Sequence, residues 1–326
     1  MLSPIVSRST PPSDSSPLLV ARRLVGECIH TDPKRWREAV YTRDPVKLLH
    51  AEGVVNRAFF KMLELSSFVS VPPKHVALLC EAPGGFLQCA TRIWPEATFH
   101  AHSMFGEGCI PFHQAVKKYV TRPLPCGGDV CEAEVARALC RIVGSHSVDL
   151  VTADGGKEIK DLDREEELCL PLLFHQVSTC LLLQRKGGTA IVKMFEGSTR
   201  AVRDTFDVLK DQYQSVYLYK PRTSKVANAE RYAIAVSLKD ETRAREVAHH
   251  IQTTAHRAAR ERKCVTQLLA SPSIQTERAF QSLSAKQVTE IHRLLRNDRE
   301  ELASLAVEDF RWINRACSKS LQAALG

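Results

Sequence analysis

A chain of 326 residues, 44% of them hydrophobic, can bury a sizeable core, so the sequence predicts a globular protein. It carries 45 Lys and Arg against 37 Asp and Glu, and the net charge of +8 favours an anionic partner such as nucleic acid. No stretch approaches the roughly 18 uninterrupted apolar residues of a membrane span, so we expect no membrane partner.

The cysteines and the first residues bear on the compartment. The 11 cysteines are scattered, without a CxxC pair or a matching Cys/His pair downstream, so we expect reduced thiols in an intracellular protein and no metal. The start MLSPIVSRSTPPSDSSPLLVARR lacks the apolar core of a secretory signal. Its Ser and Arg content suits an organellar transit peptide, but Asp14 and the paired prolines favour a tail. We therefore expect the nucleus or cytoplasm, or a viral factory for a viral protein, rather than an organelle.

Residues 1–45 are rich in Ser, Pro and Arg, which indicates a flexible, irregular segment with one short helix at PKRWREAV. From Pro45, VKLLHAEGVVNRAFFKMLELSSF has helical spacing until VPP ends it. Short apolar runs then alternate with helical patterns. Strands are expected at HVALLCEA, ATFHAHSM, PLPCGGDV, SVDLVTADGG and TAIVKMF, and helices at FLQCATRIW, CEAEVARALCRIVG, REEELCLPLLFHQVSTCLLLQRKGG, which a glycine pair ends, and STRAVRDTFDVLKDQY.

This alternation predicts an α/β fold with a mostly parallel, doubly wound sheet and helices on both faces. The last two strands, SVYLYK and ERYAIAVSL, are joined by a loop only, so we expect the last of seven strands to be antiparallel. We assign residues 46–238 to this sheet domain. Residues 239–326 are polar and purely helical in pattern, and we interpret them as a helical C-terminal extension.

Ligands of open α/β sheets bind beyond the carboxyl ends of the strands, and that edge collects charged residues here. Asp129 follows the third strand, Asp154 follows the fourth, and Glu230 begins the last. Lys193 interrupts the apolar strand AIVKMF. One interpretation is a structural salt bridge, because a buried unpaired charge costs several kcal/mol. The other is a lysine that acts as a base because burial and a second cation, Lys61, destabilise its ammonium form.

The stretches NRAFFKM, CEAPGGF, VTADGG, AIVKMF and KPRTSKVANAERY occur in an order that resembles the RrmJ/FtsJ-like 2'-O-methyltransferases, and most closely the mRNA cap 2'-O-methyltransferases. The resemblance spans residues 54–238 and implies a Rossmann-like class I methyltransferase fold. It also implies a catalytic tetrad of Lys61, Asp154, Lys193 and Glu230. In it Lys193 activates a ribose 2'-hydroxyl, and we expect Lys61 and burial to lower its pKa from about 10.4.

The methyl donor implied by the resemblance is S-adenosylmethionine, and the transfer needs no metal. The residues implied to hold the donor are Glu81, Ala82, Pro83, Gly84, Gly85, Phe86, Asp129 and Asp154. Asp129 would accept a hydrogen bond from the adenine amino group, and Asp154 would lie beside the methionine ammonium. One departure from the family is that no acid follows the second strand before Glu107, which leaves the ribose contact open.

The expected substrate is RNA, with the capped 5' end of mRNA favoured by the form of KPRTSKVANAERY. Arg57, Arg222 and Lys225 are the expected phosphate contacts, while Lys157 and Arg231 are weaker candidates near the same edge. The C-terminal helices would extend the RNA track, bind a partner protein, or simply cap the sheet.

Three alternatives remain beside this hypothesis. The first is the same chemistry on ribosomal or other non-cap RNA. The second is a non-catalytic RNA-binding scaffold of a capping complex, which the presence of all four tetrad residues disfavours. A Rossmann oxidoreductase is disfavoured because CEAPGGF is not GxGxxG.

Overall fold

The computed structural model describes residues 2–7, 16–122, 124–157, 159, 161, 164–261 and 263–325. Its centre is a six-stranded sheet with the order β3-β2-β4-β5-β7-β6. Only β7 runs against the others, because it is antiparallel to both β5 and β6 while the remaining pairs are parallel. The strands are β2 (His75–Leu79), β3 (Thr98–Ala101), β4 (Val148–Ala153), β5 (Gln184–Met194), β6 (Tyr213–Tyr219) and β7 (Arg231–Leu238). The predicted mostly parallel α/β sheet with an antiparallel last strand is confirmed.

Among the described residues, one of the seven expected strands is missing from the sheet. The strand expected at PLPCGGDV, third in chain order, is wrong for the residues of that stretch that the structure describes. They contain the 3-10 helix η3 (Cys126–Gly128), in which Gly127 and Gly128 have φ angles of 59° and 72°. A strand does not accommodate these left-handed angles. Just before this stretch, Val120 forms a single parallel bridge with Ala101 at the end of β3. The segment therefore runs beside the sheet as a loop.

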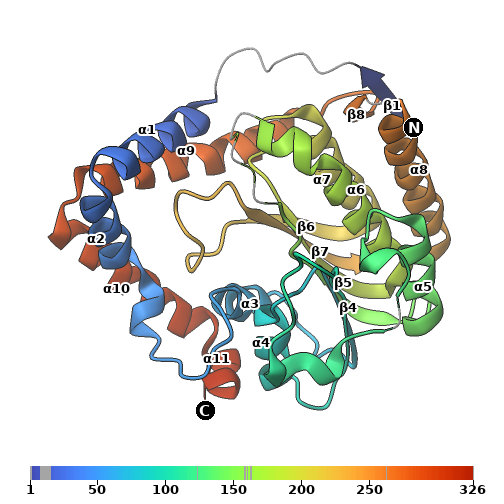
Figure 1. Ribbon diagram of the computed structural model, residues 1–326, viewed down its shortest axis with the longest axis horizontal. Helices are drawn as coiled ribbons and strands as arrows, with labels where there is room; N and C mark the ends of the chain where they lie inside the picture. Colours follow the sequence, from blue (N-terminus) through green and yellow to red (C-terminus); the bar gives the residue numbers. More distant parts are fainter. Residues whose placement is uncertain are drawn as a thin grey trace.

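Helices cover both faces of the sheet, as predicted (Figure 1). Because side chains alternate along a strand, Leu150 of β4 joins one apolar cluster and its neighbour Val151 joins the other. The first cluster includes α3 (Ala58–Ser66) and α4 (Gly85–Ile93). The second includes α5 (Ala133–Val143), α6 (Glu165–Leu183), α7 (Arg200–Gln212) and α8 (Glu241–Arg260). Helix α6 is long and apolar enough to cross a membrane, but 83% of that window is buried inside this fold.

A helical arm packs beside the sheet domain. It consists of α1 (Pro17–Thr31), α2 (Pro33–Arg43), α9 (Ile274–Arg296) and α10 (Arg299–Ala316), which lie together on the left of Figure 1. The chain then ends in α11 (Ser318–Leu325), which packs against α3 and α4. The short 3-10 helices η1 (Pro45–Leu48) and η2 (Gln114–Tyr119) lie in connecting loops.

The expectation of an irregular segment up to residue 45 is wrong for residues 17–31, which form α1, whereas the short helix expected at PKRWREAV is confirmed as α2. Each helix begins with a capping residue followed by proline, a combination suited to a helix start. Ser16 Oγ accepts the N–H of Leu19, and Asp32 Oδ1 accepts that of Arg35. The tail expected over residues 8–15 lies outside the described residues.

Two further expectations need correction. The segment after residue 239 is not purely helical, because β8 (Cys264–Leu269) pairs antiparallel with β1 (Leu2–Ser7). Helix α6 ends at Leu183, before the glycine pair, and both glycines lie inside β5. The helix stops there because Gln184 adopts an extended backbone and its Nε2 donates to the carbonyls of Val148 and Asp149 in β4.

Candidate active site

Four charged side chains meet at the carboxyl end of the sheet. Lys61 lies on α3, Asp154 follows β4, Lys193 lies near the end of β5, and Glu230 precedes β7. Lys61 Nζ is 3.3 Å from Asp154 Oδ2 and 3.2 Å from Glu230 Oε2. Lys193 Nζ is 3.6 Å from Asp154 Oδ1 and 3.4 Å from Glu230 Oε2. Each carboxylate therefore faces both ammonium groups, and the structure brings together the four residues that the sequence placed at this edge.

All four side chains are shielded from water, with exposed fractions between 9% and 17%. Burying one such charge alone costs several kcal/mol, and pairing offsets only part of that cost. Two cations and two anions cancel, which makes the group tolerable as a unit. A single pair would satisfy packing, so the second pair is an excess that the fold itself does not require.

Tyr232 is a member of this site that the sequence reasoning missed. Its hydroxyl accepts a hydrogen bond from Lys61 Nζ at 3.0 Å and donates to Asp154 Oδ1 at 2.6 Å. Tyr232 lies directly opposite Lys193 in the β5–β7 register. The signal available in the sequence was its spacing, because residues two apart in a strand share a face and Tyr232 follows Glu230 by two.

The expected lowering of the Lys193 pKa is wrong for the free protein. Burial does lower the pKa of this lysine, but the Asp154 and Glu230 carboxylates together outweigh burial and raise it above its ordinary value. For Glu230 the balance runs the other way: burial raises its pKa, but Lys61 and Lys193 lower it further than burial raises it. The resting site thus holds Lys193 as an ammonium and Glu230 as a carboxylate.

The turn after β2 brings α4 close to α3. Gly84 has a φ of 115°, and a Cβ there would lie 2.5 Å from Val116 Cγ2. A Cβ on Gly85 would lie 2.0 Å from Asn56 Oδ1, just before α3. Both glycines therefore have a packing role, whatever else they contact. Because α3 carries Lys61, this close approach also sets where the Lys61 side chain starts.

Glu81 and Phe86 flank this turn on the inside. The Glu81 carboxylate is buried and accepts the N–H of Leu87 at 2.8 Å, in the first turn of α4. Burial raises the pKa of Glu81 to about 8, with the backbone hydrogen bond opposing that rise. The Phe86 ring is fully buried, and Lys61 Nζ lies 5.8 Å from its centre. Glu81 holds the start of α4, and Phe86 packs beside Lys61. Ala82 and Pro83 form the turn between β2 and α4.

The structure offers a set of groups that suits S-adenosylmethionine. Asp154 donates its backbone N–H to the Leu79 carbonyl at the end of β2 at 3.4 Å, and Asp129 follows Gly128, whose carbonyl lies 2.7 Å from the ring of His102 after β3. One carboxylate can accept a hydrogen bond from an ammonium group and the other from an adenine amino group, so these two acceptors fit S-adenosylmethionine. Asp129 Oδ1 already accepts the N–H of Cys131 at 2.9 Å, which fixes the carboxylate.

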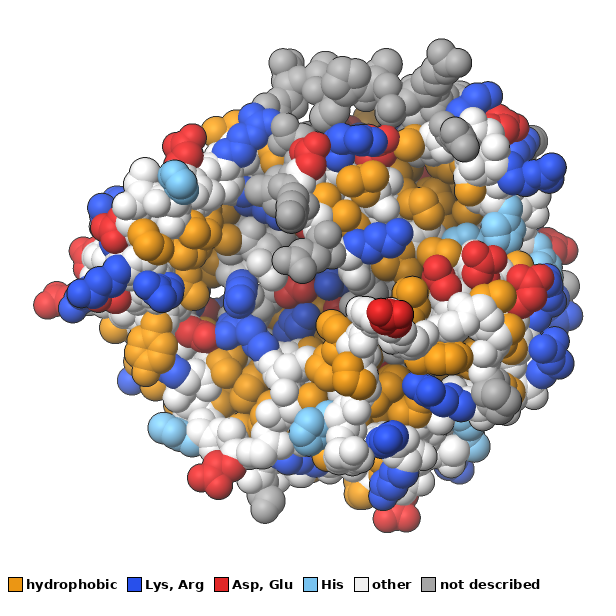
Figure 2. Space-filling view, in the orientation of Figure 1, with side chains coloured by type: hydrophobic (Ala, Val, Ile, Leu, Met, Phe, Trp, Pro, Cys, Tyr) orange, Lys and Arg blue, Asp and Glu red, His pale blue; other side chains and the backbone are white. Residues whose placement is uncertain are grey.

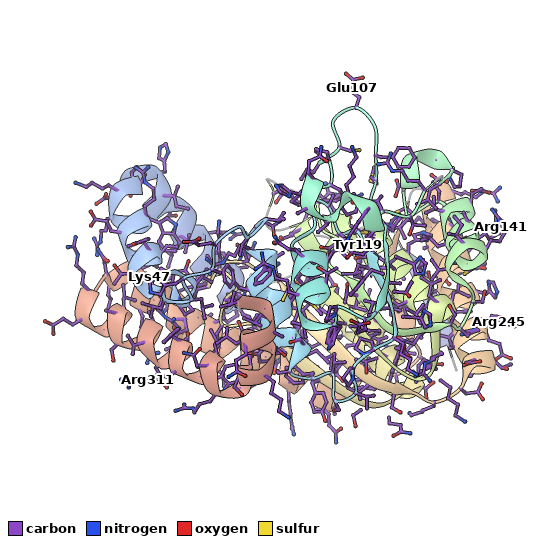
Figure 3. The ribbon with its side chains drawn as sticks, turned by 90° about the horizontal axis from the view of Figure 1, so that it is seen from below. Lys47, Glu107, Tyr119, Arg141, Arg245 and Arg311 are labelled. Atoms are coloured by element: carbon purple, nitrogen blue, oxygen red, sulfur yellow. The ribbon has the colours of Figure 1, made fainter. Side chains whose placement is uncertain are left out.

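The residue that directly follows β3 is His102. The ring is buried; Nε2 lies 2.7 Å from the Gly128 carbonyl, and Nδ1 accepts the N–H of Cys80 at 3.4 Å. These bonds require the proton on Nε2. Glu107, the first acidic residue after β3, is exposed at the tip of a loop that projects from the molecule (Figure 3).

The expected phosphate contacts differ in how they are held. Arg57 is paired with Asp44, and Arg222 with Asp309, while each keeps an exposed fraction of 29% and 36%. Lys225 is exposed. Arg231 is a wrong candidate, because it is fully buried and donates to the Glu196 carbonyl at 2.6 Å. On the face seen in Figure 2, Lys and Arg side chains gather between the helical arm and the sheet.

Within the described residues, one group of three potential metal ligands lies close together. Cys126, Glu132 and Glu134 have their ligand atoms within 4.8 Å of one another, and all three side chains are exposed. Exposed acidic groups of this kind are common in proteins without a bound ion.

A sequence model of the FtsJ-like methyltransferase family matches residues 54–238, more than half of the chain. The chain therefore belongs to the FtsJ-like methyltransferase family, and the predicted Rossmann-like class I methyltransferase fold is confirmed. The matched segment contains α3 and the whole six-stranded sheet, and so all four residues of the tetrad.

Several relatives are named for methylation of the mRNA cap. The cap-specific mRNA (nucleoside-2'-O-)-methyltransferase 1 of Trypanosoma brucei is 31% identical over 111 residues, covering 33% of this chain and 30% of that protein. The corresponding enzyme 2 of Danio rerio is 28% identical over 176 residues, covering 48% and 24%. The enzyme of Autographa californica nuclear polyhedrosis virus is 26% identical over 162 residues, covering 48% and 61%.

The chain thus spans between 24% and 61% of the length of these three relatives. A solved structure, a ribosomal RNA methyltransferase of Plasmodium falciparum, matches with a TM-score of 0.41 and 18% identity, covering 56% of this chain and 97% of that one.

Proposed function

We propose that the protein transfers the methyl group of S-adenosylmethionine to a ribose 2'-hydroxyl of RNA, and that its substrate is the cap-proximal end of mRNA. The observation that carries the proposal is the buried cluster of Lys61, Asp154, Lys193 and Glu230 at the ligand edge of the sheet. Its two lysines and two acids exceed what packing needs, and Lys193 lies in an otherwise apolar strand.

Lys193 is the proposed general base. The neutral amine takes the proton of the 2'-hydroxyl as the hydroxyl oxygen forms its bond to the methyl carbon, and the proton remains on Nζ. Asp154 and Glu230 orient the amine by their contacts at 3.6 and 3.4 Å. When bound, S-adenosylmethionine would supply the methyl group from its sulfonium, whose bond from sulfur to the methyl carbon breaks and leaves a neutral thioether. Because the two carboxylates raise the pKa of Lys193, we expect only a minority of the resting protein to hold the neutral amine near neutral pH.

The donor would be held by the turn at residues 82–85 together with Asp129 and Asp154. Asp154 then has two tasks, because the same carboxylate faces Lys61 and Lys193. No step in this proposal needs a metal, since positioning and charge supply the rate enhancement.

The cap as substrate is supported by the names of the three relatives, which all specify mRNA caps. Arg57, Arg222 and Lys225 would contact the RNA phosphates. Ribosomal or other non-cap RNA is the competing substrate, and it would use the same tetrad. A function at the mRNA 5' end suits the nucleus, the cytoplasm or a viral factory.

The test is transfer of labelled methyl from S-adenosylmethionine to matched short RNAs with and without a 5' cap. Cap-dependent label that nuclease digestion maps to a 2'-oxygen is the expected result. Label on uncapped RNA alone would replace the cap by another RNA class. Binding of S-adenosylmethionine and RNA without any transfer would favour a scaffold.

A further inference from the structure

The loop between β6 and β7 (residues 220–230) carries Arg222, Lys225 and the tetrad residue Glu230. Lys220 Nζ donates to the carbonyls of Asn228 and Glu230 at 2.7 and 3.2 Å, which ties the two ends of the loop together. Further along, the loop depends on contacts from other elements. In Figure 1 it extends from the sheet toward the helical arm.

Glu64 on α3 fixes the backbone at the start of this loop. Its carboxylate is fully buried and accepts the N–H groups of Arg222 and Thr223 at 2.9 and 2.6 Å, and the hydroxyl of Tyr219 at 2.8 Å. Lys61 lies on the same helix one turn earlier. The start of the loop is thereby set by the helix that supplies a tetrad lysine.

Gln287 on α9 fixes the far part of the loop. The side chain is 3% exposed, and its Nε2 donates to the carbonyls of Val226 and Asn228 at 2.6 and 2.7 Å. These two bonds use both N–H groups of the amide. A residue nearly sixty positions away in the sequence thus supplies partners for the loop backbone on either side of Ala227.

Asp309 and Trp312 on α10 fix the Arg222 side chain. Asp309 is 8% exposed on its side chain; it is ion-paired with Arg222 and contacts Arg43 of α2 at 2.7 Å. The Arg222 guanidinium lies 4.6 Å from the centre of the Trp312 ring. A guanidinium has five N–H donors in one plane, so the pair with Asp309 leaves donors on its exposed edge.

From these contacts we propose that Gln287 and Asp309 are positioning residues, which hold the β6–β7 loop so that Arg222 and Lys225 receive the phosphate backbone of the RNA. This inference rests on the proposed function and names a task for the helical arm. The arm would set affinity for RNA, while the tetrad sets the chemical step. Removing Asp309 would free the Arg222 side chain, while Glu64 and Gln287 would still hold the loop backbone.

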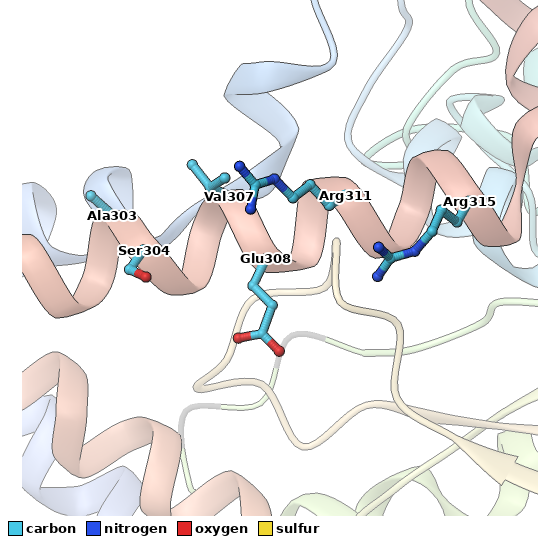
Figure 4. Close-up of a pocket in the computed structure, with 6 residues that line it drawn as sticks. All are labelled: Ala303, Ser304, Val307, Glu308, Arg311 and Arg315. Atoms are coloured by element: carbon cyan, nitrogen blue, oxygen red, sulfur yellow. The ribbon is translucent and has the colours of Figure 1, made fainter.

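The opposite expectation follows if Asp309 acts only as a charge. An acid beside Arg222 reduces the local positive potential, so its removal would strengthen phosphate binding. Glu308, the next residue on α10, offers the matched control. It lies with Ser304, Arg311 and Arg315 on the exposed side of α10, along an open hollow of ≈ 590 Å³ (Figure 4).

The test compares the full-length wild type with Asp309→Asn, Gln287→Leu and Glu308→Gln. We expect Asp309→Asn to raise the KM for RNA about ten-fold with kcat within about two-fold, as for lost binding of both ground and transition states. Gln287→Leu should act in the same direction. Hydrogen exchange of the amides in residues 220–230 should accelerate in Gln287→Leu, which loses the two bonds to the loop backbone, and Glu308→Gln should match the wild type in every readout.

Asp309→Glu should restore part of the RNA affinity, and Asp309→Asn should add nothing to Arg222→Ala, because the two residues act through one contact. Unchanged exchange in Gln287→Leu, or tighter RNA binding by Asp309→Asn, would overturn the inference. If the wild type binds RNA but transfers no methyl, the proposed function fails, while exchange and RNA affinity still decide whether these residues position the loop.

Discussion

Strand β4 carries an aspartate at each end, and the two side chains have different kinds of partner. Asp149, near its start, accepts the backbone N–H groups of Lys74 and His75 at 2.7 and 2.8 Å and pairs with the exposed Arg185. Asp154, after its end, has side-chain partners, which come from α3, β5 and β7. Asp149 joins the starts of two neighbouring strands, and Asp154 pairs with two buried lysines.

The difference suggests separate roles for the two aspartates: Asp149 stabilises the fold, and Asp154 belongs to the candidate site. Burial raises the pKa of Asp149, but its backbone hydrogen bonds and Arg185 lower it more, so the group stabilises the fold above the ordinary aspartate pKa and loses that contribution as pH falls. The Asp154 carboxylate instead contacts the side chains of Lys61, Lys193 and Tyr232. Its partners are groups that can exchange protons or turn toward a ligand, which is what a reacting site requires.

The largest expected effect is that of Lys193→Met, which keeps the length of the side chain and removes the amine. Methyl transfer should fall by about a thousand-fold or more if the lysine is the general base. Lys186→Met is the control, because Lys186 lies in the same strand and is exposed at its other end. Equal activity of the two variants would mean that Lys193 only forms salt bridges.

Glu230→Gln should reduce kcat about a hundred-fold and change its pH dependence. A base acts in its neutral form, so a raised pKa of Lys193 places the rise of activity at high pH. Loss of one of the two carboxylates that raise this pKa should move the rise toward lower pH. The measurement is kcat/KM against pH at saturating methyl donor. A rise that stays in place would contradict the role given to Glu230.

A smaller effect is expected for Tyr232→Phe. The ring keeps its place in the core, while the bridge from Lys61 to Asp154 through the hydroxyl is lost. We expect kcat to fall about ten-fold with the KM for RNA unchanged, since one hydrogen bond to a charged group is worth roughly 1.5–3 kcal/mol. Steady-state kinetics checks this, and an unchanged kcat would remove Tyr232 from the site.

Much of the site was predictable, because strand ends and interrupted apolar runs are local signals. Lys193 interrupts such a run, and Asp154 follows a parallel strand. Glu230 precedes the antiparallel strand β7, whose start lies at the same edge of the sheet. The need for a second cation near Lys193 pointed to Lys61, and the family resemblance joined the four residues into a tetrad. The helix at PKRWREAV was predicted and is α2, whereas α1 was missed although Ser16 before a proline is the same start signal.

What failed depended on distances between remote residues. The sign of the Lys193 pKa shift follows from how closely two carboxylates approach one amine, which no spacing reveals. Arg231 reads as a cation at the ligand edge, yet its side chain turns inward to backbone carbonyls. Glu64 reads as a polar position on a helix, and only the fold brings it to the N–H groups of Arg222 and Thr223.

The most direct test compares Asp154→Asn with Asp149→Asn in one experiment that records both methyl transfer and the free energy of unfolding. We predict that Asp154→Asn, measured while folded, loses transfer by about a hundred-fold or more. It should also lose stability, because one buried cation is left without its partner. Asp149→Asn should lose about 1–3 kcal/mol of stability and, while folded, transfer methyl at the wild-type rate. Loss of stability without loss of transfer in Asp154→Asn would contradict the division between a structural and a catalytic end of the sheet.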